Sequence, residues 1–300
     1  MIFENLEKLP NEFGLEKKEK CTHNRHRSNM MLNPLNLKHL NRIDDIDADV
    51  ITLNLEDAIA PSRKKEALKN IALFLSHLKY SNSTIVVRVN PLELGGYEEI
   101  EYLNPFGFDA IRVAKIKDTT EIAQALSILD VEKELHISLE TKEAFNQLSN
   151  LRIDERFTTV NLGILDLLTS LGLPQSIVKL NNPTIDYILS KFLVDAKIAG
   201  LTPVSFMFQE YNDTKSFREW AYREKEMGFT AKACMGPKQV AIANEIFAID
   251  EFEYKRALHI KNEFEKNSAK GINGFMDSRY DIFIDEPIYR DALLVLGESL

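Results

Sequence analysis

Short apolar and β-branched runs recur along this chain, and each is bounded by polar or turn residues. Their length and composition are typical of β-strands, so the pattern predicts eight of them. The runs are SNMMLN from Ser28, VITLNLE from Val50, TIVVRVN from Thr84, AIRVAKI from Ala110, LHISLE from Leu135, TVNLGIL from Thr159, TPVSFMF from Thr202 and TAKACM from Thr230.

Helical spacing of apolar residues fills the segments between these runs. One helix is predicted after Pro61, where a single stripe is formed by Leu68, Ile71, Ala72, Leu75 and Leu78. Two more helices have signals at both ends, one from Asn182 and Pro183 to Gly200, the other from Asp213 to Gly228. An apolar stripe on each helix is suited to packing against a sheet.

A strand followed by a helix, eight times over, predicts a closed (β/α)8 TIM barrel, an α/β fold. A doubly wound open sheet uses the same units and stays open as the alternative. We expect residues 1–25, which are polar and lack a sustained period, to form an N-terminal arm. The barrel is expected to span 26–250, and residues 251–300 to form a charged helix, a glycine-containing hairpin or loop and a final helix.

The composition narrows the classes of function. Apolar residues make up 44% of the 300 and charged residues 28%, which is typical of a soluble globular protein. A net charge of -9 disfavours nucleic acid as a partner. No apolar run reaches the roughly 18 residues of a membrane span. Cys21 and Cys234 are too few and too far apart to indicate a disulfide framework or a zinc site. Because the first twenty residues also do not resemble a targeting peptide, we predict a cytoplasmic protein.

Polar residues gather where the predicted strands end. All strands of a barrel point the same way, so these side chains are expected to converge on one face. They are Glu56, Asp57, Arg88, Asn90, Lys115, Glu140 and Asp166. Glu140 and Asp166 follow neighbouring strands and supply the carboxylate oxygens that Mg²⁺ prefers. Glu56 and Asp57 are expected to orient water on the metal, and capping of the next helix is the alternative for each acid.

Arg88 alternates with valines in VVRVNP, so its charge is expected to be partly buried and to need a partner. Two interpretations stay open: the guanidinium binds a substrate carboxylate or a developing enolate, or it forms a structural pair with Glu56 or Asp57. Nucleophile elbows and phosphate-binding glycine loops are absent from the sequence, which disfavours acyl-serine hydrolysis and nucleotide-dependent phosphoryl transfer.

Five segments, in order and at plausible spacing, resemble the citrate lyase beta-subunit and malyl-CoA lyase group of the HpcH/HpaI aldolase superfamily. The resemblance runs from about Arg27 to the C-terminus. Its segments are LNLEDAIAPSRKKEA from Leu53, VRVNP from Val87, SLET from Ser138, GILDL from Gly163 and FIDEPIYRDA from Phe283.

The resemblance implies a magnesium-dependent lyase that cleaves or forms a carbon-carbon bond between a 2-oxo acid and an acyl-CoA thioester. It implies that Glu140 and Asp166 hold Mg²⁺, that Arg88 polarises the 2-oxo acid, and that Glu56 and Asp57 support the metal waters.

The same resemblance implies roles for residues outside this cluster. The C-terminal segment is expected to form a lid that packs on a neighbouring subunit of a homotrimer, with Asp285 as an acid or base acting in trans. Arg27 and Lys64 are expected near the phosphates of CoA.

Several positions depart from the pattern of the family, and they leave two alternatives open. These positions are Asn54, Leu35, Ala144, Gly236 and the neighbourhood of Ser205. Because most of them affect the CoA side, one alternative is an aldolase that acts on free 2-oxo acids. The other is a barrel that binds a ligand without turnover.

Overall fold

The computed structural model describes residues 7–21, 23 and 25–297, and the chain divides into two compact units, one up to Phe247 and one from Ala248. Within the described residues, no helix combines the length and the apolar character that crossing a membrane requires.

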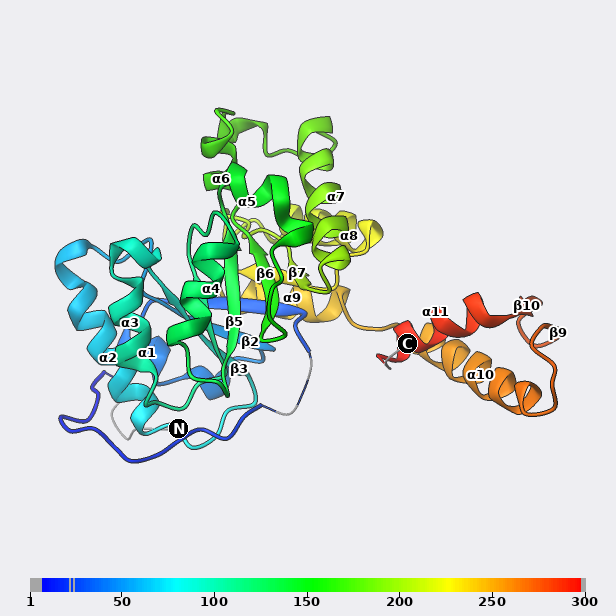
Figure 1. Cartoon of the computed structure of the whole chain (residues 1–300), viewed down its shortest axis with the longest axis horizontal. Coiled ribbons are helices and arrows are strands. Elements are labelled where there is room, and N and C mark those ends of the chain that lie inside the picture. Colours follow the sequence, from blue (N-terminus) through cyan, green and yellow to red (C-terminus); the bar gives the residue numbers. More distant parts are fainter. Residues whose placement is uncertain (1–6, 22, 24, 298–300) are drawn as a thin grey trace. The chain divides into compact units, whose positions relative to one another are not determined.

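The first unit is built on eight parallel strands among the residues that the structure describes (Figure 1). They are β1 (Ser28–Leu32), β2 (Val50–Asn54), β3 (Thr84–Val89), β4 (Ala110–Val113), β5 (Glu134–Leu139), β6 (Phe157–Leu162), β7 (Thr202–Val204) and β8 (Lys232–Cys234). Neighbours follow the chain in the order β7-β6-β5-β4-β3-β2-β1-β8. A bridge between Ser205 and Lys232 joins the two edges. The predicted (β/α)8 barrel is therefore confirmed, and the open sheet is excluded.

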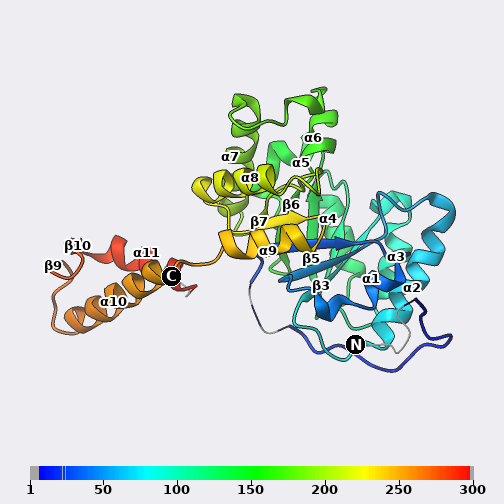
Figure 2. The ribbon, with the colours of Figure 1, turned by 180° about the vertical axis from the view of Figure 1, so that it is seen from behind.

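Helices lie on the outside of the strands (Figures 1 and 2). They are α1 (Leu37–Leu40), α2 (Lys64–Ser76), α3 (Gly96–Leu103), α4 (Thr119–Ile128), α5 (Lys142–Gln147), α6 (Ile164–Ser170), α7 (Pro183–Ile198), α8 (Thr214–Met227) and α9 (Pro237–Ile246). The predicted ends of α7 and α8 are confirmed, since Asn182 and Asp213 accept hydrogen bonds from backbone N–H groups of their first turns. Gly200 and Gly228 adopt the left-handed backbone at the other ends.

The interior of the barrel changes character along its axis. Near the amino ends of the strands, Val50, Val86 and Ala110 form a small buried apolar cluster. Nearer the carboxyl ends the buried side chains are polar, and they include Asn29, Thr52, Arg88, Arg112, Ser138 and Asn161. Because buried polar groups need partners, this second layer is where a ligand site is expected.

The described residues before β1 have no helix or strand, and they pack against the barrel. Lys18 is the anchor of this segment: its ammonium group is buried and donates to both carboxylate oxygens of Asp109, at 2.9 and 2.8 Å. Asp109 also accepts from the backbone N–H groups of Cys21 and Ile85. One buried carboxylate thus joins this segment to the start of β3.

The second unit consists of α10 (Glu251–Ser268), an antiparallel pair of β9 (Phe275–Asp277) and β10 (Ile282–Ile284), and α11 (Glu286–Leu296). Ala257, Ile260, Phe264, Ile284 and Ala292 form its own apolar core. The predicted order of charged helix, hairpin and final helix is confirmed.

Candidate active site

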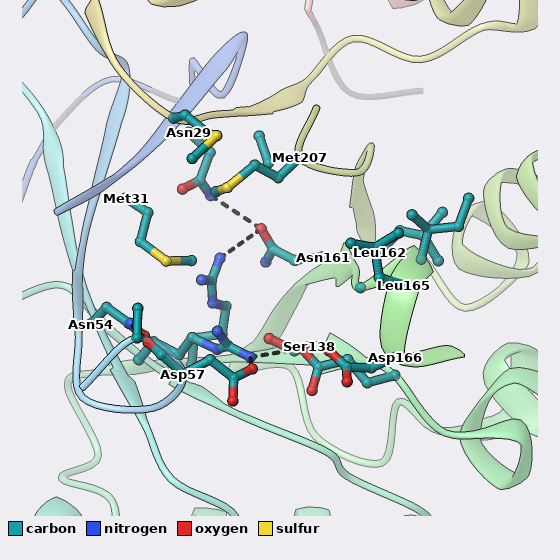
Figure 3. Close-up of a pocket in the computed structure, with 18 of the residues that line it drawn as sticks. Asn29, Met31, Asn54, Asp57, Ser138, Asn161, Leu162, Leu165, Asp166 and Met207 are labelled. Atoms are coloured by element: carbon teal, nitrogen blue, oxygen red, sulfur yellow. Dashed lines mark hydrogen bonds and ion pairs between the residues drawn. The ribbon is translucent and has the colours of Figure 1, made fainter. Parts of the chain in front are cut away.

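A pocket of about 390 Å³ opens at the carboxyl ends of the barrel strands. Residues from all eight strands or the turns after them line it, and Figure 3 shows many of these side chains directed into it. The polar lining residues are Asn29, Asn33, Asn54, Asp57, Arg88, Arg112, Ser138, Glu140, Asn161, Asp166 and Gln209. This face is the one that carries the active site in barrel enzymes.

Arg88 lies among three acids of the pocket region. Its Nη2 atom is 2.7 Å from Glu140, 2.9 Å from Glu56 and 3.7 Å from Asp57. Lys115 approaches the same group, with Nζ 3.0 Å from Glu56. Five of the strand-end side chains that the sequence predicts to converge therefore do so, whereas Asn90 is bonded to Glu99 and does not line the pocket.

The loops that carry these groups adopt unusual backbone conformations. Ala58 follows Glu56 and Asp57 in the turn after β2, and its φ is 69°. Lys115, after β4, has φ of 55°. Non-glycine residues rarely adopt such angles, and they persist where the surrounding structure enforces them, often at functional sites. Asn54 holds the first loop, because its side chain donates to the backbone oxygen of Asp57 and accepts from the N–H of Glu56.

The neighbouring carboxyl groups of Glu56 and Asp57 have pKa values shifted in opposite directions. Burial by itself would raise the pKa of Glu56, but the hydrogen bonds from Asp57 and the charge of Arg88 lower it to about 2. Burial, followed by the hydrogen bond and the charge of Glu56, raises the pKa of Asp57 to about 6. Glu56 is therefore an anion near neutral pH, and Asp57 exchanges its proton close to that range.

Glu140 has one carboxylate oxygen to spare. Oε1 accepts from Arg88 at 2.7 Å, whereas Oε2 is buried and has no hydrogen-bond partner among the residues that the structure describes. Burial raises the pKa of Glu140 in spite of Arg88, and the charges of Glu56 and Asp166 raise it further. A buried oxygen without a donor, among neighbouring anions, is the environment that a cation would satisfy.

Asp166 lies in the first turn of α6 and lines the same pocket. Gly163 leaves room for the side chain of Glu140, because a Cβ atom there would lie only 2.3 Å from Cγ of Glu140. No group of three or more His, Cys, Asp or Glu suited to a metal occurs in the described part of the chain. Two carboxylates nevertheless fit Mg²⁺, which takes one or two of them and fills its other positions with water and substrate.

The model of the HpcH/HpaI aldolase/citrate lyase family matches residues 27–237. This chain belongs to that family.

Relatives and solved structures agree with this family. An L-malyl-CoA/beta-methylmalyl-CoA lyase of Rhodobacter capsulatus is 25% identical over 252 residues, 75% of this chain and 79% of that protein. Citrate lyase subunit beta of Leuconostoc mesenteroides subsp. cremoris is 25% identical over 266 residues, 83% of this chain and 85% of that protein. The CitE protein of Mycobacterium tuberculosis, solved with magnesium, acetoacetate and coenzyme A, has a TM-score of 0.69 at 17% identity and covers 91% of this chain and 98% of its own. The two relatives from Rhodobacter capsulatus and Leuconostoc mesenteroides are both named as lyases.

Two residues expected at the active site, Lys64 and Arg27, do not line the pocket, and a third, Asp285, belongs to the other unit of the chain. Lys64, the first residue of α2, donates to the side chain of Asn90 just after β3. Arg27 precedes β1, so it lies at the amino ends of the strands, where it forms two side-chain hydrogen bonds of 2.8 Å with Asp49. Asp285 belongs to the second unit, where its side chain caps α11 by accepting from the N–H of Ile288.

The sequence analysis missed some residues of the pocket, above all Arg112. It lies in β4 beside Arg88, its register partner on β3, and it lines the same cavity. The signal was present, because Arg112 alternates with apolar residues in AIRVAKI just as Arg88 does in VVRVNP. Asn161, its hydrogen-bond partner on β6, gave no comparable signal.

Proposed function

We propose that this protein is a magnesium-dependent carbon-carbon lyase. The substrate would be a 3-hydroxyacyl-CoA such as citryl-CoA or malyl-CoA, and the products a 2-oxo acid and an acyl-CoA. The observation that carries the proposal is the buried Oε2 of Glu140, which has no partner within residues 7–21, 23 and 25–297. Glu140 lines one pocket with Asp166 and Arg88. The names of the relatives support the substrate class.

Glu140 and Asp166 would hold the Mg²⁺ ion. When bound there, the ion would supply a positive charge that draws electron density from the carboxylate and carbonyl oxygens of the 2-oxo acid. Arg88 fixes the orientation of Glu140 by donating to Oε1, so Oε2 stays directed away from Arg88. Glu56 and Asp57 would accept hydrogen bonds from water on the ion.

Arg88 would also act on the substrate. Its Nη2 atom is held by Glu56 and Glu140, while its buried Nε has no partner among the described residues. The guanidinium would donate to the oxygen that is the hydroxyl of the 3-hydroxyacyl-CoA and the carbonyl of the 2-oxo acid. This oxygen carries negative charge before the carbon-carbon bond breaks and gains it when the bond forms. Its two carboxylate contacts hold it before substrate arrives, which lowers the cost of ordering it.

The carbon next to the thioester carbonyl must also gain or lose a proton. We propose that Asp285 of a neighbouring copy in a homotrimer performs this transfer, which typically accelerates a reaction by about 10²- to 10⁴-fold. Lys64 is the basic residue that we propose near the phosphates of CoA. We leave Arg27 out of this role, because its guanidinium is engaged by Asp49 at the other end of the barrel.

An aldolase that uses free 2-oxo acids is the second candidate. The observation in its favour is that neither basic residue expected at the CoA phosphates lines the pocket, since Lys64 is bonded to Asn90 and Arg27 to Asp49. Incubation of pyruvate, glyoxylate and oxaloacetate with and without acetyl-CoA separates the candidates. Reaction that requires the thioester supports the lyase, and equal reaction without it supports the aldolase.

The central test removes the metal-binding oxygens one residue at a time. We expect Glu140→Gln and Asp166→Asn to weaken Mg²⁺ binding, measured by calorimetry. The loss should exceed the roughly 10- to 100-fold that is typical when a residue that only supports a metal ligand is removed. Cleavage of malyl-CoA or citryl-CoA should fall with it. Glu143→Gln changes an exposed acid three residues away and serves as the matched control. Unchanged Mg²⁺ affinity in both site variants would refute the proposed metal site.

A further inference from the structure

Arg112 is a buried arginine that no carboxylate of the described residues contacts directly. Its exposed fraction is 3%, and it forms no ion pair with a carboxylate in the part of the chain that the structure describes. Its hydrogen bond within that part goes to the neutral side-chain oxygen of Asn161, 3.0 Å from Nη1. Such a charge is rarely buried unless something compensates it.

The groups around Arg112 leave donors rather than acceptors free. Nε of Arg112 and Nδ2 of Asn161 are both buried, and neither has a hydrogen-bond partner in the described part of the chain. The oxygen of Asn161 is already shared, since it accepts from Arg112 and from Asn29, and Thr52 in turn donates to the oxygen of Asn29 at 2.9 Å. This chain of hydrogen bonds fixes the orientation of Asn161, whose side chain lines the pocket.

These donors lie at one end of the pocket, and the carboxylates lie at the other. Figure 3 shows Asn29 and Asn161 well apart from Asp57, with Met31 and Met207 beside the polar end. Arg88 offers the contrast, because Glu56 and Glu140 already neutralise it. A water molecule at the polar end would accept hydrogen bonds only, whereas an anion would accept them and also place a negative charge directly beside Arg112.

We infer that Arg112 and Asn161 form a subsite for a second carboxylate, so that the pocket selects a 2-oxo dicarboxylic acid over a 2-oxo monocarboxylic acid. The inference rests on the proposed function, which places the 2-oxo acid group at the opposite end beside Arg88. Arg88 and Arg112 are register partners on adjacent strands about 4.8 Å apart, so one short diacid can reach both.

The chemistry of the side chain supports this assignment. Burial, followed by the charge of Arg88, lowers the pKa of Arg112 to about 9, so the guanidinium still carries its charge near neutral pH. Its planar fork of N–H groups matches the two oxygens of a carboxylate. The apolar side chains of Met31 and Met207 are suited to the methylene group between the two acid groups.

The test compares two acids that differ only at the distal end. Oxaloacetate carries a carboxylate where 2-oxobutyrate, of the same length, carries a methyl group. With the full chain and Mg²⁺ present, we expect calorimetry to give a dissociation constant about 10- to 100-fold lower for oxaloacetate. In Arg112→Met, which keeps much of the side chain's volume, the ratio of the two constants should fall close to one.

A second variant protects the test against a failure of Arg112→Met to fold. Asn161→Asp places a carboxylate where Arg112 already donates, so the subsite would be filled by the protein itself. We expect this variant to fold, as checked by circular dichroism, and to lose the preference for oxaloacetate as well.

The outcomes distinguish the subsite from the proposed function. If both acids bind the wild type in a Mg²⁺-dependent way with equal affinity, or if both variants keep the preference, the subsite is wrong and the proposed metal site stands. If neither acid binds the wild type in the presence of Mg²⁺, the subsite and the proposed function both fail.

Discussion

At the residue scale, Asp49 and Glu140 each bind an arginine, but they differ in how many carboxylate oxygens that arginine occupies. Asp49 uses both oxygens on Arg27, which donates from its side chain and from its backbone. Glu140 uses one oxygen on Arg88, and the other has no partner in the part of the chain that the structure describes. The first acid is saturated and has a structural role, whereas the second retains capacity to bind a ligand.

The space at Gly163 is predicted to be essential for that capacity. A Cβ atom in Gly163→Ala would overlap Cγ and crowd Oε1 of Glu140, so the carboxylate must move. We expect Mg²⁺ affinity, measured by calorimetry, to fall by roughly 10-fold or more.

Gly172→Ala is the matched control near the other end of α6. Nothing lies within 4 Å of a Cβ atom there, but φ is +72°, so alanine should lower the free energy of unfolding by about 1 kcal/mol and leave Mg²⁺ binding intact. Equal Mg²⁺ affinity in both alanine variants would contradict the role of Gly163.

His26 is predicted to make stability depend on pH. Burial, followed by the charge of His136, lowers the pKa of His26 from 6.5 to about 4. Above pH 6.5 the imidazole is neutral in both the folded and the unfolded chain. As the pH falls from 6.5 to 4, only the unfolded chain takes up the proton, so the free energy of unfolding should drop by up to about 3 kcal/mol.

Urea unfolding at pH 7.5 and pH 4.5 measures this effect. His26→Gln should show a smaller drop in the free energy of unfolding than the wild type, while His39→Gln, a change at an exposed residue of α1, should show the same drop. A drop of equal size in His26→Gln would assign the pH dependence to other groups.

At the element scale, the strands set the positions of the site and the segments between them set its chemistry. β3, β4 and β5 bring Arg88, Arg112 and Glu140 to one pocket through parallel pairing in register. The turns after β2 and β4 add Asp57 and Lys115, and they do so through left-handed backbone at positions 58 and 115. Rigid strands and strained turns together hold charges that would otherwise separate in water.

The segment before β1 is predicted to contribute to stability through one ion pair. Lys18→Met would leave the buried carboxylate of Asp109 without its cation, although two backbone N–H groups remain on it. We expect the free energy of unfolding to fall by about 3 kcal/mol in urea titrations. Lys17→Met changes the exposed neighbour and should have little effect. A loss of similar size in Lys17→Met would mean that the ion pair is not the cause.

At the scale of the whole molecule, the barrel closes by a narrow contact and the second unit has a core of its own. β7 and β8 meet through the single bridge at Ser205, whose backbone exchanges hydrogen bonds with Ala231 and Ala233. The cluster of Ala257, Ile260 and Phe264 stabilises the second unit independently. A unit with its own core can act as a separate body, which is what a lid on a neighbouring copy requires.

Complementation between subunits tests the proposed action of Asp285 in trans. Asp285→Asn keeps the cap of α11, because asparagine caps helices as well as aspartate, but removes the titratable group. We expect this variant and Glu140→Gln each to be nearly inactive. Co-expressed in equal amounts, they should assemble sites with both native residues and recover roughly one quarter of wild-type activity, as random mixing in a closed ring predicts. No recovery in a purified mixed oligomer would refute action in trans.

The sequence by itself determined the strands and the face of the site. Buried strands need continuous apolar runs and their ends need polar residues, so the eight runs and the positions of Glu56, Arg88, Glu140 and Asp166 were readable without coordinates. The helix signals at Asn182 and Asp213 were readable for the same reason, since a cap depends on residues only a few positions apart.

Only the tertiary structure decided which charge meets which partner. In the sequence, nothing distinguishes Arg27 and Lys64 from other basic residues near a motif. In the structure, Arg27 binds Asp49 and Lys64 binds Asn90. Arg112 shares the pattern of Arg88 but ends beside Asn161 instead of a carboxylate. Spacing along a strand predicts the direction of a side chain, whereas its partners come from strands distant in the chain, and the closed barrel is what brings those together.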